Sequence, residues 1–317
     1  MRALLQLLAA LLASVLLYGA VFSVVHRPLT VGEIAPLITR KATHLQSLAT
    51  PRVVILAGSN GRFSHRCQPI TQATGLPCSN LSVAVGLGLD FQLQQWEPLL
   101  RAGDVVYMPL EYSQYGMGRN EMEGGAENSV LVHDFRDQLQ RLPWQRQWRA
   151  WSSFDLPFLV HGFLEMGLSH GGAQRRGGVT LFTAEGDQRG HTQQAGLAYR
   201  EFLAQARFDN RALPTDSHAM QVVSAFLGRA RQRGVTVVGG WPTTPQTVTL
   251  DGSSQVRLRR LFEDHGQLFL ELPDRSQYPL SCFFDTLYHL NETCQEQHSQ
   301  RVGAALLDLL KQRPNER

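Results

Sequence analysis

The stretch "VVILAGSNGRFSHRC", from Val53 to Cys67, decides how this chain is interpreted. Its apolar, β-branched beginning is typical of a buried strand. The run then passes directly into Gly-Ser-Asn-Gly. Such a sequence forms an ordinary turn, but it also displays Ser59 at the end of a strand, where a nucleophile could lie.

Strands and helices are predicted to alternate along most of the chain. This pattern indicates an α/β fold, a three-layer α/β/α arrangement with a flavodoxin-like parallel central sheet. Ligands bind such sheets at the carboxyl ends of the strands, and Ser59 follows one of these ends. The predicted strands are 52–57, 77–85, 104–110, 235–239 and 268–272, and the predicted helices are 87–101, 217–233 and 296–312.

Residues 112–200 do not fit this alternation and are predicted to be an inserted helical and loop region, lying over the site or beside it. Within it, "LPWQRQWRAW" combines Trp144, Trp148 and Trp151 with two arginines. Three interpretations stay open: the tryptophans stack on sugars, contact a membrane surface, or pack on the core as part of an amphipathic helix.

The N-terminus predicts export. Residues 3–25 carry no charge and are long enough, at about 1.5 Å per residue, to cross a hydrocarbon core of ~30 Å. We favour an uncleaved membrane anchor over residues 1–25, and a cleaved signal segment is the alternative. A stem is expected over 26–50 and the catalytic domain over 51–317. The formal net charge of +3 gives no indication of nucleic-acid binding.

Four cysteines agree with an oxidising compartment. They form two close pairs, Cys67 with Cys78 and Cys282 with Cys294, and three connectivities are possible. We predict the two local disulfides. A metal site is the alternative, but the sequence has no C-x-x-C motif, and the other histidines, among them His65 and His191, have no metal-ligand spacing. These histidines are expected to be surface or satisfied interior residues, and neither a metal nor a cofactor is expected.

The stretch "SCFFDTLYHLNETC", from Ser281 to Cys294, places Asp285 and His289 close together before the last helix. A disulfide between Cys282 and Cys294 would hold that loop in place. The chain order Ser…Asp…His is one in which an acid orients a histidine that activates a serine. An exposed turn carrying an unrelated aspartate and histidine is the alternative.

With these residues in view, the chain resembles the SGNH (GDSL-type) hydrolase superfamily, in particular its exported polysaccharide O-acetyltransferases and related esterases. The similar blocks are short and spread over the exported part: "LAGSN" (56–60), "NLSVAVGLGLD" (80–90), "VVYMPLEY" (105–112) and "FFDTLYHLN" (283–291). The resemblance implies that Ser59 is the nucleophile, His289 the general base and Asp285 its orienting partner. It also implies that the backbone N–H groups of Gly86 and Ser59 bind the oxyanion.

The chain departs from the family pattern in two places. The family spaces its acid and base as D-x-x-H, whereas Asp285 and His289 have one residue more between them. The G-x-N-D block is also missing, and "PLEYSQY" stands in its place. Glu111 and Tyr112 are therefore expected to bind substrate, Glu111 alternatively holding a loop, and Asn60 is expected to substitute for the missing oxyanion asparagine.

The resemblance implies an O-acetyltransferase that modifies an exopolysaccharide of cellulose-like or alginate-like type through an acyl-serine. Its acetyl donor would come from a membrane-bound acyltransferase partner. An acetylesterase with the same site, and a non-catalytic polysaccharide-binding or assembly protein, are the alternatives. Lysine occurs only at Lys41 and Lys311, with arginine supplying the other cations, which is typical of GC-rich bacterial genes. The expected location is the bacterial inner membrane facing the periplasm, or the periplasm itself if the first segment is cleaved.

Overall fold

The apolar run after Arg52 forms a strand at the centre of a parallel five-stranded sheet. The computed structural model describes residues 1–125, 127–173, 181–208 and 213–312. Within these ranges the sheet has the order β2 (Cys78–Asn80), β1 (Val53–Ile55), β3 (Val105–Met108), β4 (Thr236–Gly240) and β6 (Leu268–Leu270).

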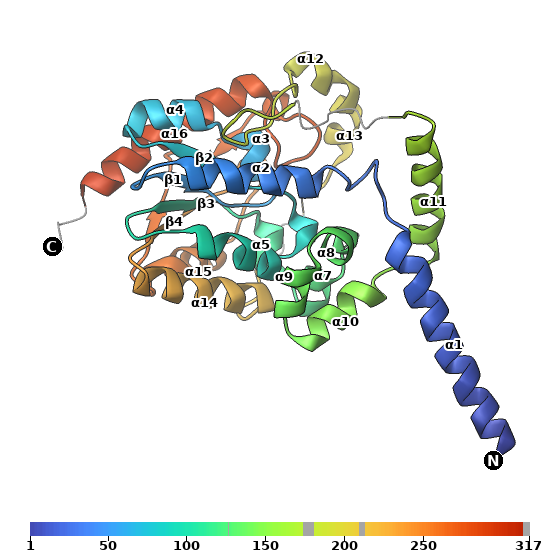
Figure 1. Cartoon of the computed structure of the whole chain (residues 1–317). Coiled ribbons are helices and arrows are strands. Elements are labelled where there is room, and N and C mark those ends of the chain that lie inside the picture. The colour runs from blue at the N-terminus through green and yellow to red at the C-terminus, as the bar shows by residue number, and fades with distance from the viewer. Residues whose placement is uncertain (126, 174–180, 209–212, 313–317) are drawn as a thin grey trace.

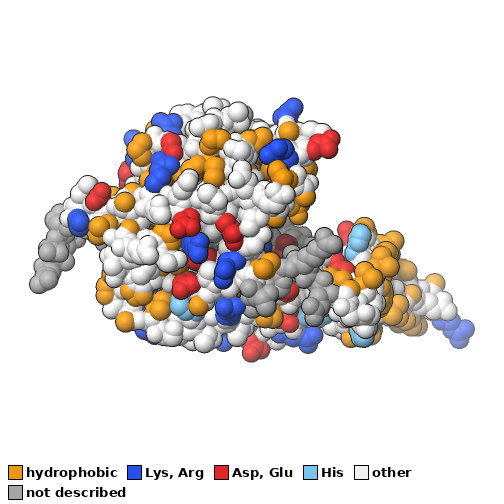
Figure 2. Space-filling view, turned by 90° about the horizontal axis from the view of Figure 1, so that it is seen from above, with side chains coloured by type: hydrophobic (Ala, Val, Ile, Leu, Met, Phe, Trp, Pro, Cys, Tyr) orange, Lys and Arg blue, Asp and Glu red, His pale blue; other side chains and the backbone are white. Residues whose placement is uncertain are grey.

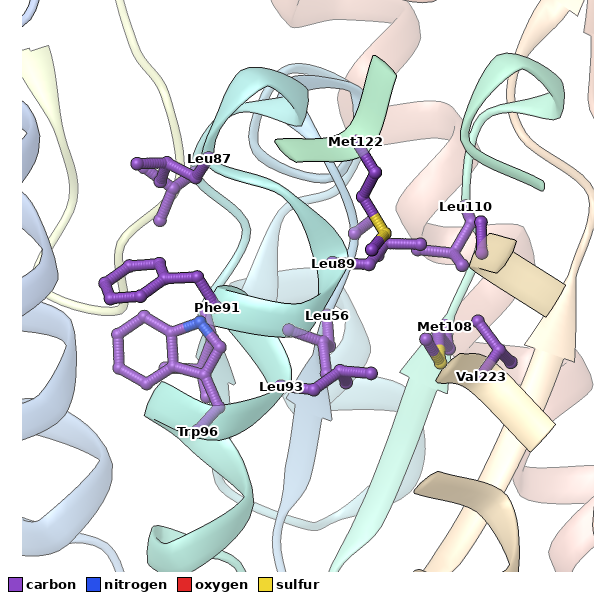
Figure 3. Packing of buried hydrophobic residues seen from close by; sticks show 14 of the residues in the cluster. Leu56, Leu87, Leu89, Phe91, Leu93, Trp96, Met108, Leu110, Met122 and Val223 are labelled. Carbon is purple, nitrogen blue, oxygen red and sulfur yellow. The ribbon is translucent and has the colours of Figure 1, made fainter. Parts of the chain in front are cut away.

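Both faces of the sheet are covered, because successive side chains of the central strands β1 and β3 are apolar. Val53 and Ile55 belong to one buried cluster, and Val54 and Leu56 belong to the other. Figure 1 shows helices above and below the sheet, and Figure 3 shows Leu56 and Met108 packed against side chains of α5 and α14. The covering helices are α4 (Cys67–Thr74) and α16 (Glu292–Lys311) on one face, and α5 (Leu89–Trp96), α14 (His218–Gln232) and α15 (Gly252–Glu263) on the other.

This arrangement confirms the predicted fold class. Numbered along the chain, the five sheet strands lie in the order 2-1-3-4-5, which is the flavodoxin-like order of doubly wound sheets. In this order the direction of winding reverses between β1 and β3. A crevice forms at the carboxyl ends of these two strands, and Ser59 and Glu111 follow them directly.

Some elements differ from the prediction. The last helix begins at Glu292, four residues early, because the Asn291 side chain accepts a hydrogen bond from the Cys294 N–H and caps it. The expected strand 77–85 is shorter: it ends at Asn80, and a 3₁₀ helix follows at Val85–Leu87. A small second sheet, β5 (Thr244–Pro245) with β7 (Gln277–Tyr278), was not expected.

The insertion is helical, as predicted, within the described residues. Of its tryptophans, Trp151 packs against the core, whereas Trp144 and Trp148 are 72% and 63% exposed. The core-packing interpretation therefore holds for Trp151 alone of these three. The helices are α6 (Tyr112–Gly116), α7 (Arg119–Glu123), α8 (Asn128–Asp134), α9 (Arg136–Arg141), α10 (Trp144–Ser152), α11 (Leu156–His170), α12 (Gln193–Gly196) and, at its end, α13 (Arg200–Gln205).

The N-terminal apolar segment forms α1 (Arg2–Val24), a helix long and apolar enough to cross a membrane. Figure 1 shows it projecting away from the domain. The expected stem is better described as part of the domain. Its helix α2 (Ile34–Ser47) buries Leu37 and Ile38 in the core, and its Lys41 Nζ donates to the carbonyl of Asn80, 2.5 Å away, at the end of β2.

The two disulfides are the local ones that were predicted. Cys67–Cys78 joins the first residue of α4 to the first residue of β2. Cys282–Cys294 closes the loop before α16 that carries Asp285 and His289. No cysteine remains free.

Candidate active site

Ser59 lies at the first position of α3 (Ser59–Ser64), immediately beyond β1. The glycines on either side of Ser59 and Asn60 are required by close packing rather than by an ordinary turn. A Cβ at Gly58 would lie 2.5 Å from the Val85 side chain, and one at Gly61 would lie 2.0 Å from the Ser82 hydroxyl. The Gly-Ser-Asn-Gly sequence therefore lets α3 begin directly against the strand ends, with Ser59 at the edge of the sheet.

Three side chains from two distant parts of the sequence meet at this edge. His289 Nε2 is 2.9 Å from Ser59 Oγ, and His289 Nδ1 is 2.7 Å from Asp285 Oδ1. When the imidazole is neutral with its proton on Nδ1, it donates to Asp285 and accepts the Ser59 hydroxyl proton. His289 is buried, and Asp285 is about a quarter exposed.

The imidazole is held from its face as well as from its edges. The Phe63 ring stacks on His289 with a centroid distance of 4.2 Å and an interplanar angle of 10°. Phe63 comes from α3, the same short helix that carries Ser59. One element thus fixes both the hydroxyl and the ring that receives its proton. Sequence reasoning did not single out Phe63.

The loop before α16 accommodates the extra residue between Asp285 and His289. Its two ends are joined by the Cys282–Cys294 disulfide and by an antiparallel bridge between Phe283 and Leu290. Inside it, the Phe284 N–H donates to the His289 carbonyl at 2.8 Å. The chain therefore turns back on itself, and the aspartate and histidine meet on one side of a closed loop.

Ser64 attaches this loop to α3. Its hydroxyl lies 2.9 Å from the Tyr288 carbonyl and accepts from the Leu290 N–H at 3.3 Å. These contacts are made on both sides of His289 in sequence. The position of the imidazole relative to Ser59 is therefore set by α3 itself.

Gly86 lies in the 3₁₀ helix Val85–Leu87 and lines the same cavity as Ser59. A Cβ at Gly86 would come within 2.1 Å of the Glu127 carboxylate, so the close approach of Glu127 depends on a glycine here. The Ser59 N–H, at the first position of a helix, has no acceptor within that helix. The oxyanion role of these two N–H groups stays a prediction.

The expectation that Asn60 supplies an oxyanion donor from its side chain is wrong. Asn60 is fully buried, and its Nδ2 donates to the Pro109 carbonyl at 2.7 Å. This contact ties the start of α3 to the end of β3. The physical reason is direction: the residue after Ser59 points back into the sheet edge rather than into the cavity.

Glu111 and Tyr112 follow β3 but have different surroundings. The Glu111 carboxylate lies beneath Ser59, where it accepts from the Asn60 N–H at 3.4 Å and contacts the Ser59 hydroxyl. Burial raises the pKa of Glu111, and the nearby His289 charge and these hydrogen bonds partly oppose the rise. The Tyr112 ring instead lies beside Trp241, in a separate hollow, and does not line the Ser59 cavity. The expected substrate contact by Tyr112 is therefore not made at this cavity.

The cavity at Ser59 has a volume of about 680 Å³. Four aromatic side chains line it, together with two arginines and two glutamates. Sequence reasoning missed these residues, because they come from α2, α3, the insertion and the last loop, which no local pattern connects. They are Phe63, Phe182, Tyr199, Phe284, Arg62, Arg189, Glu33 and Glu127.

His191, expected to be a surface or satisfied interior residue, is an interior residue that also lines the Ser59 cavity. It is 2% exposed, and its ring lies close to the backbone of Phe63 and Arg189, without a hydrogen bond of good geometry in the described part of the chain. Its ring packs edge-on against Phe63 at 5.2 Å. Burial lowers the pKa of His191 to about 4, so at neutral pH it presents one donor and one acceptor. Over the described residues no cluster of His, Cys, Asp and Glu fits a metal ion.

Comparison with known proteins adds little to this geometry. No protein-family model matches the chain, and no curated protein matches it. Among solved structures it is similar to the crystal structure of protein YxiM from Bacillus subtilis, with 9% sequence identity and a TM-score of 0.39. The match covers 84% of this chain and 57% of that one, so the chain spans little more than half the length of YxiM. A likeness this loose carries no conclusion about family or activity.

Proposed function

We propose that this chain is an exported serine acyltransferase that acetylates the hydroxyl groups of an exopolysaccharide. The observation that carries the proposal is the continuous hydrogen-bonded series Ser59–His289–Asp285 beside a cavity at the switch point of the sheet. A serine hydroxyl is a weak nucleophile until a base takes its proton, and this arrangement supplies that base already oriented.

In the first half-reaction, Ser59 Oγ attacks the carbonyl carbon of an acetyl ester while His289 Nε2 takes the hydroxyl proton. The N–H groups of Ser59 and Gly86 stabilise the negative oxygen that forms. The bond to the leaving alcohol then breaks, and His289 returns the proton to that alcohol. Ser59 is left as an acetyl ester, and Asp285 stabilises the imidazolium while it carries the proton.

In the second half-reaction, a sugar hydroxyl attacks the acetyl-serine and gives its proton to His289. The intermediate collapses to the acetylated sugar, and the proton returns to Ser59. No cofactor is consumed. We propose that a membrane-bound acyltransferase delivers the donor on the exported side, and that the acceptor is of cellulose-like or alginate-like type.

The cavity lining supports a sugar acceptor. Aromatic rings such as Phe182 and Tyr199 offer apolar faces for pyranose C–H groups, and Arg189 and Glu127 offer polar partners at the same cavity. The His191 ring, which makes no hydrogen bond of good geometry among the described residues, adds a donor and an acceptor that a sugar hydroxyl can pair with. Water as acceptor, which makes the protein an acetylesterase, uses the same serine and histidine.

The packing of α1 supports the anchor over the cleaved segment. Tyr18 bonds to the Trp151 and Phe154 carbonyls and Phe22 stacks on Phe154, and cleavage after Ser23 would remove both residues. The apolar helix and the two disulfides together support a location outside the cytoplasm. We propose the bacterial inner membrane, with the domain in the periplasm.

The test is acetyl transfer by the full-length chain in detergent, with p-nitrophenyl acetate as donor. Ser59→Ala should abolish nitrophenol release, whereas Ser253→Ala, at the exposed start of α15, should match the wild type. Equal release by wild type and Ser59→Ala contradicts the catalytic proposal and favours a polysaccharide-binding or assembly protein.

Added cello-oligosaccharides or oligomannuronates then separate transferase from esterase. A transferase forms acetylated oligosaccharide in a Ser59-dependent way, and His191→Ala raises the KM for the oligosaccharide without changing hydrolysis of the small donor. An esterase yields acetate at the same rate whether or not the sugar is present.

A further inference from the structure

The end of α1 is fixed to the junction between α10 and α11. The Tyr18 hydroxyl lies 2.8 Å from the carbonyl oxygens of both Trp151 and Phe154. The Phe22 ring, 6% exposed, stacks on Phe154 with a centroid distance of 5.5 Å. Farther along, Val25 packs against Gly162 of α11. The C-terminal part of α1 is thus a structural part of the domain and not a free tether.

If α1 spans a bilayer, these contacts determine where α10 lies relative to the membrane surface. A span needs ~20 residues for a hydrocarbon core of ~30 Å. Because the uncharged run follows the charged Arg2, a span of this length reaches to about Phe22. Tyr18 therefore lies within about one turn of the outer edge of the hydrocarbon core. Figure 1 shows α10 beside the half of α1 that is nearer the domain. The end of α10 is bonded to Tyr18, so α10 lies at the headgroup level.

The surface that α10 presents at this level is aromatic. Trp144 and Trp148 are four residues apart, so they share one face of the helix, and both are mostly exposed. The opposite face buries Ala150 and Arg146, whose guanidinium bonds to Asp90 at 2.9 Å. Packing of α10 on the domain therefore does not need the two tryptophans. They also do not line the Ser59 cavity, which leaves sugar stacking there unsupported.

The start of α11 carries a further exposed apolar side chain. Leu156 follows the Phe154 contact directly and is 69% exposed. Figure 2 shows hydrophobic side chains gathered on the arm formed by α11 and α1. Tryptophan is enriched where membranes meet water, because its ring is apolar and its N–H needs a polar partner.

We propose that Trp144, Trp148 and Leu156, together called the membrane seat, insert into the outer interface of the phospholipid bilayer that α1 spans. The domain is then held against the membrane at two places, the helix and the seat, so its orientation is fixed as well as its distance. The loop after α1 and the start of α2 contribute Thr30, Glu33 and Ile34 to the Ser59 cavity. Because these residues follow α1 directly, the membrane seat also fixes the distance of the Ser59 cavity from the bilayer surface, where a donor would leave the membrane. This inference rests on the anchor in the proposed function and not on the chemistry at Ser59.

The test is fluorescence quenching by brominated phosphatidylcholine, with the full-length chain reconstituted as single copies in lipid nanodiscs. Trp96 and Trp241 are buried inside the domain and Trp151 packs partly buried against the core, so bromine reaches the exposed Trp144 and Trp148 preferentially. We expect brominated lipid to quench the wild type and the Trp144→Phe/Trp148→Phe variant to lose most of that quenching. Because both side chains are exposed, the variant should keep the wild-type thermal midpoint.

Several results overturn the proposal. Equal quenching of wild type and variant, or no quenching of the wild type, shows that the seat does not contact lipid. If Trp144 and Trp148 are shielded from aqueous acrylamide only in native membranes and not in single-copy nanodiscs, a protein partner or second copy covers them instead. Mass spectrometry of the mature chain is the independent check. If the mature chain lacks Tyr18, α1 is not an anchor and the membrane-seat proposal is overturned. The Ser59→Ala test of catalysis is unaffected by that result.

Discussion

The Asp285→Asn substitution tests the feature in which this chain departs most from the family it resembles. The substitution keeps the shape of the side chain and removes its charge. In the acyl-transfer transition state His289 is positively charged, and Asp285 Oδ1 lies 2.7 Å from its Nδ1. The charge should therefore stabilise the transition state more than the resting enzyme, and its loss should lower kcat.

The magnitude follows from the surroundings of the pair. Two unit charges about 4 Å apart attract by about 1 kcal/mol in water and about 4 kcal/mol near a protein surface. With the Asp285 side chain 27% exposed and that of His289 9% exposed, we take about 2 kcal/mol, between these limits. This corresponds to a fall in kcat of about 30-fold, with KM for a small ester unchanged.

The assay is steady-state release of nitrophenol from p-nitrophenyl acetate at pH 8. The matched control is Asp274→Asn, because the Asp274 carboxylate pairs with Arg301 at 2.6 Å outside the Ser59 cavity. The control should retain wild-type kcat. If the kcat of Asp285→Asn stays within about twofold of the wild-type value, the 2.7 Å contact does not orient or stabilise His289. In that case Asp285, with the extra residue in D-x-x-x-H, does not act as the orienting acid.

Three further outcomes are expected. Cys282→Ser should lower kcat far more than Cys67→Ser, because only the Cys282–Cys294 disulfide closes the loop that carries His289. Loss of either disulfide should lower the free energy of unfolding by ~2–4 kcal/mol. Gly61→Ala should destabilise the fold by ~1–3 kcal/mol and lower activity, because its methyl group would overlap a buried hydroxyl beneath α3. The folded protein should lose stability as the pH falls from 6.5 towards 3. Burial lowers the pKa of His65 to about 3 and that of His298 well below its usual value, so below pH 6.5 the unfolded chain binds more protons than the folded one. At pH 5 His65 should cost about 2 kcal/mol, and His298 acts in the same direction.

The controls and measurements are matched to each change. Activity and urea unfolding of the two cysteine variants are compared at equal protein concentration, and equal kcat values would show that the loop needs no disulfide. For Gly61→Ala the control is Gly228→Ala in α14, where nothing lies within 4 Å and a gain of about 0.5–1 kcal/mol is expected. A midpoint for urea unfolding that is constant from pH 7 to pH 4.5 would contradict the histidine prediction.

Much of the sheet could be predicted from the sequence, because most of its strands are short apolar runs buried on both faces. The alternation of such runs with helical segments was enough to place Ser59 at a carboxyl end. The bounds of weaker elements were not predictable. The run 77–85 looked like one continuous strand but is a strand only to Asn80, and a side-chain cap at Asn291 started the last helix early.

The same division holds for the candidate site. Ser59, Asp285 and His289 were singled out because each sits in a recognisable local block, and the local disulfides because each pair is close in sequence. Asn60 and Tyr112 were misjudged because adjacency in sequence does not say which way a side chain points. Phe63 and His191 gave no local signal at all, since their importance lies in what packs against them.

By itself, then, the sequence determined which elements form and which residue types lie at their ends, because these depend on local periodicity and composition. Tertiary structure alone decided which of those residues meet. Ser59 and His289 are 230 residues apart in sequence, and their contact in space is set by α3, the closed loop and Ser64 together. It also decided that the segment after α1 is part of the domain and that α10 turns two tryptophans outward, because these are properties of how separate helices pack and not of any one stretch of sequence.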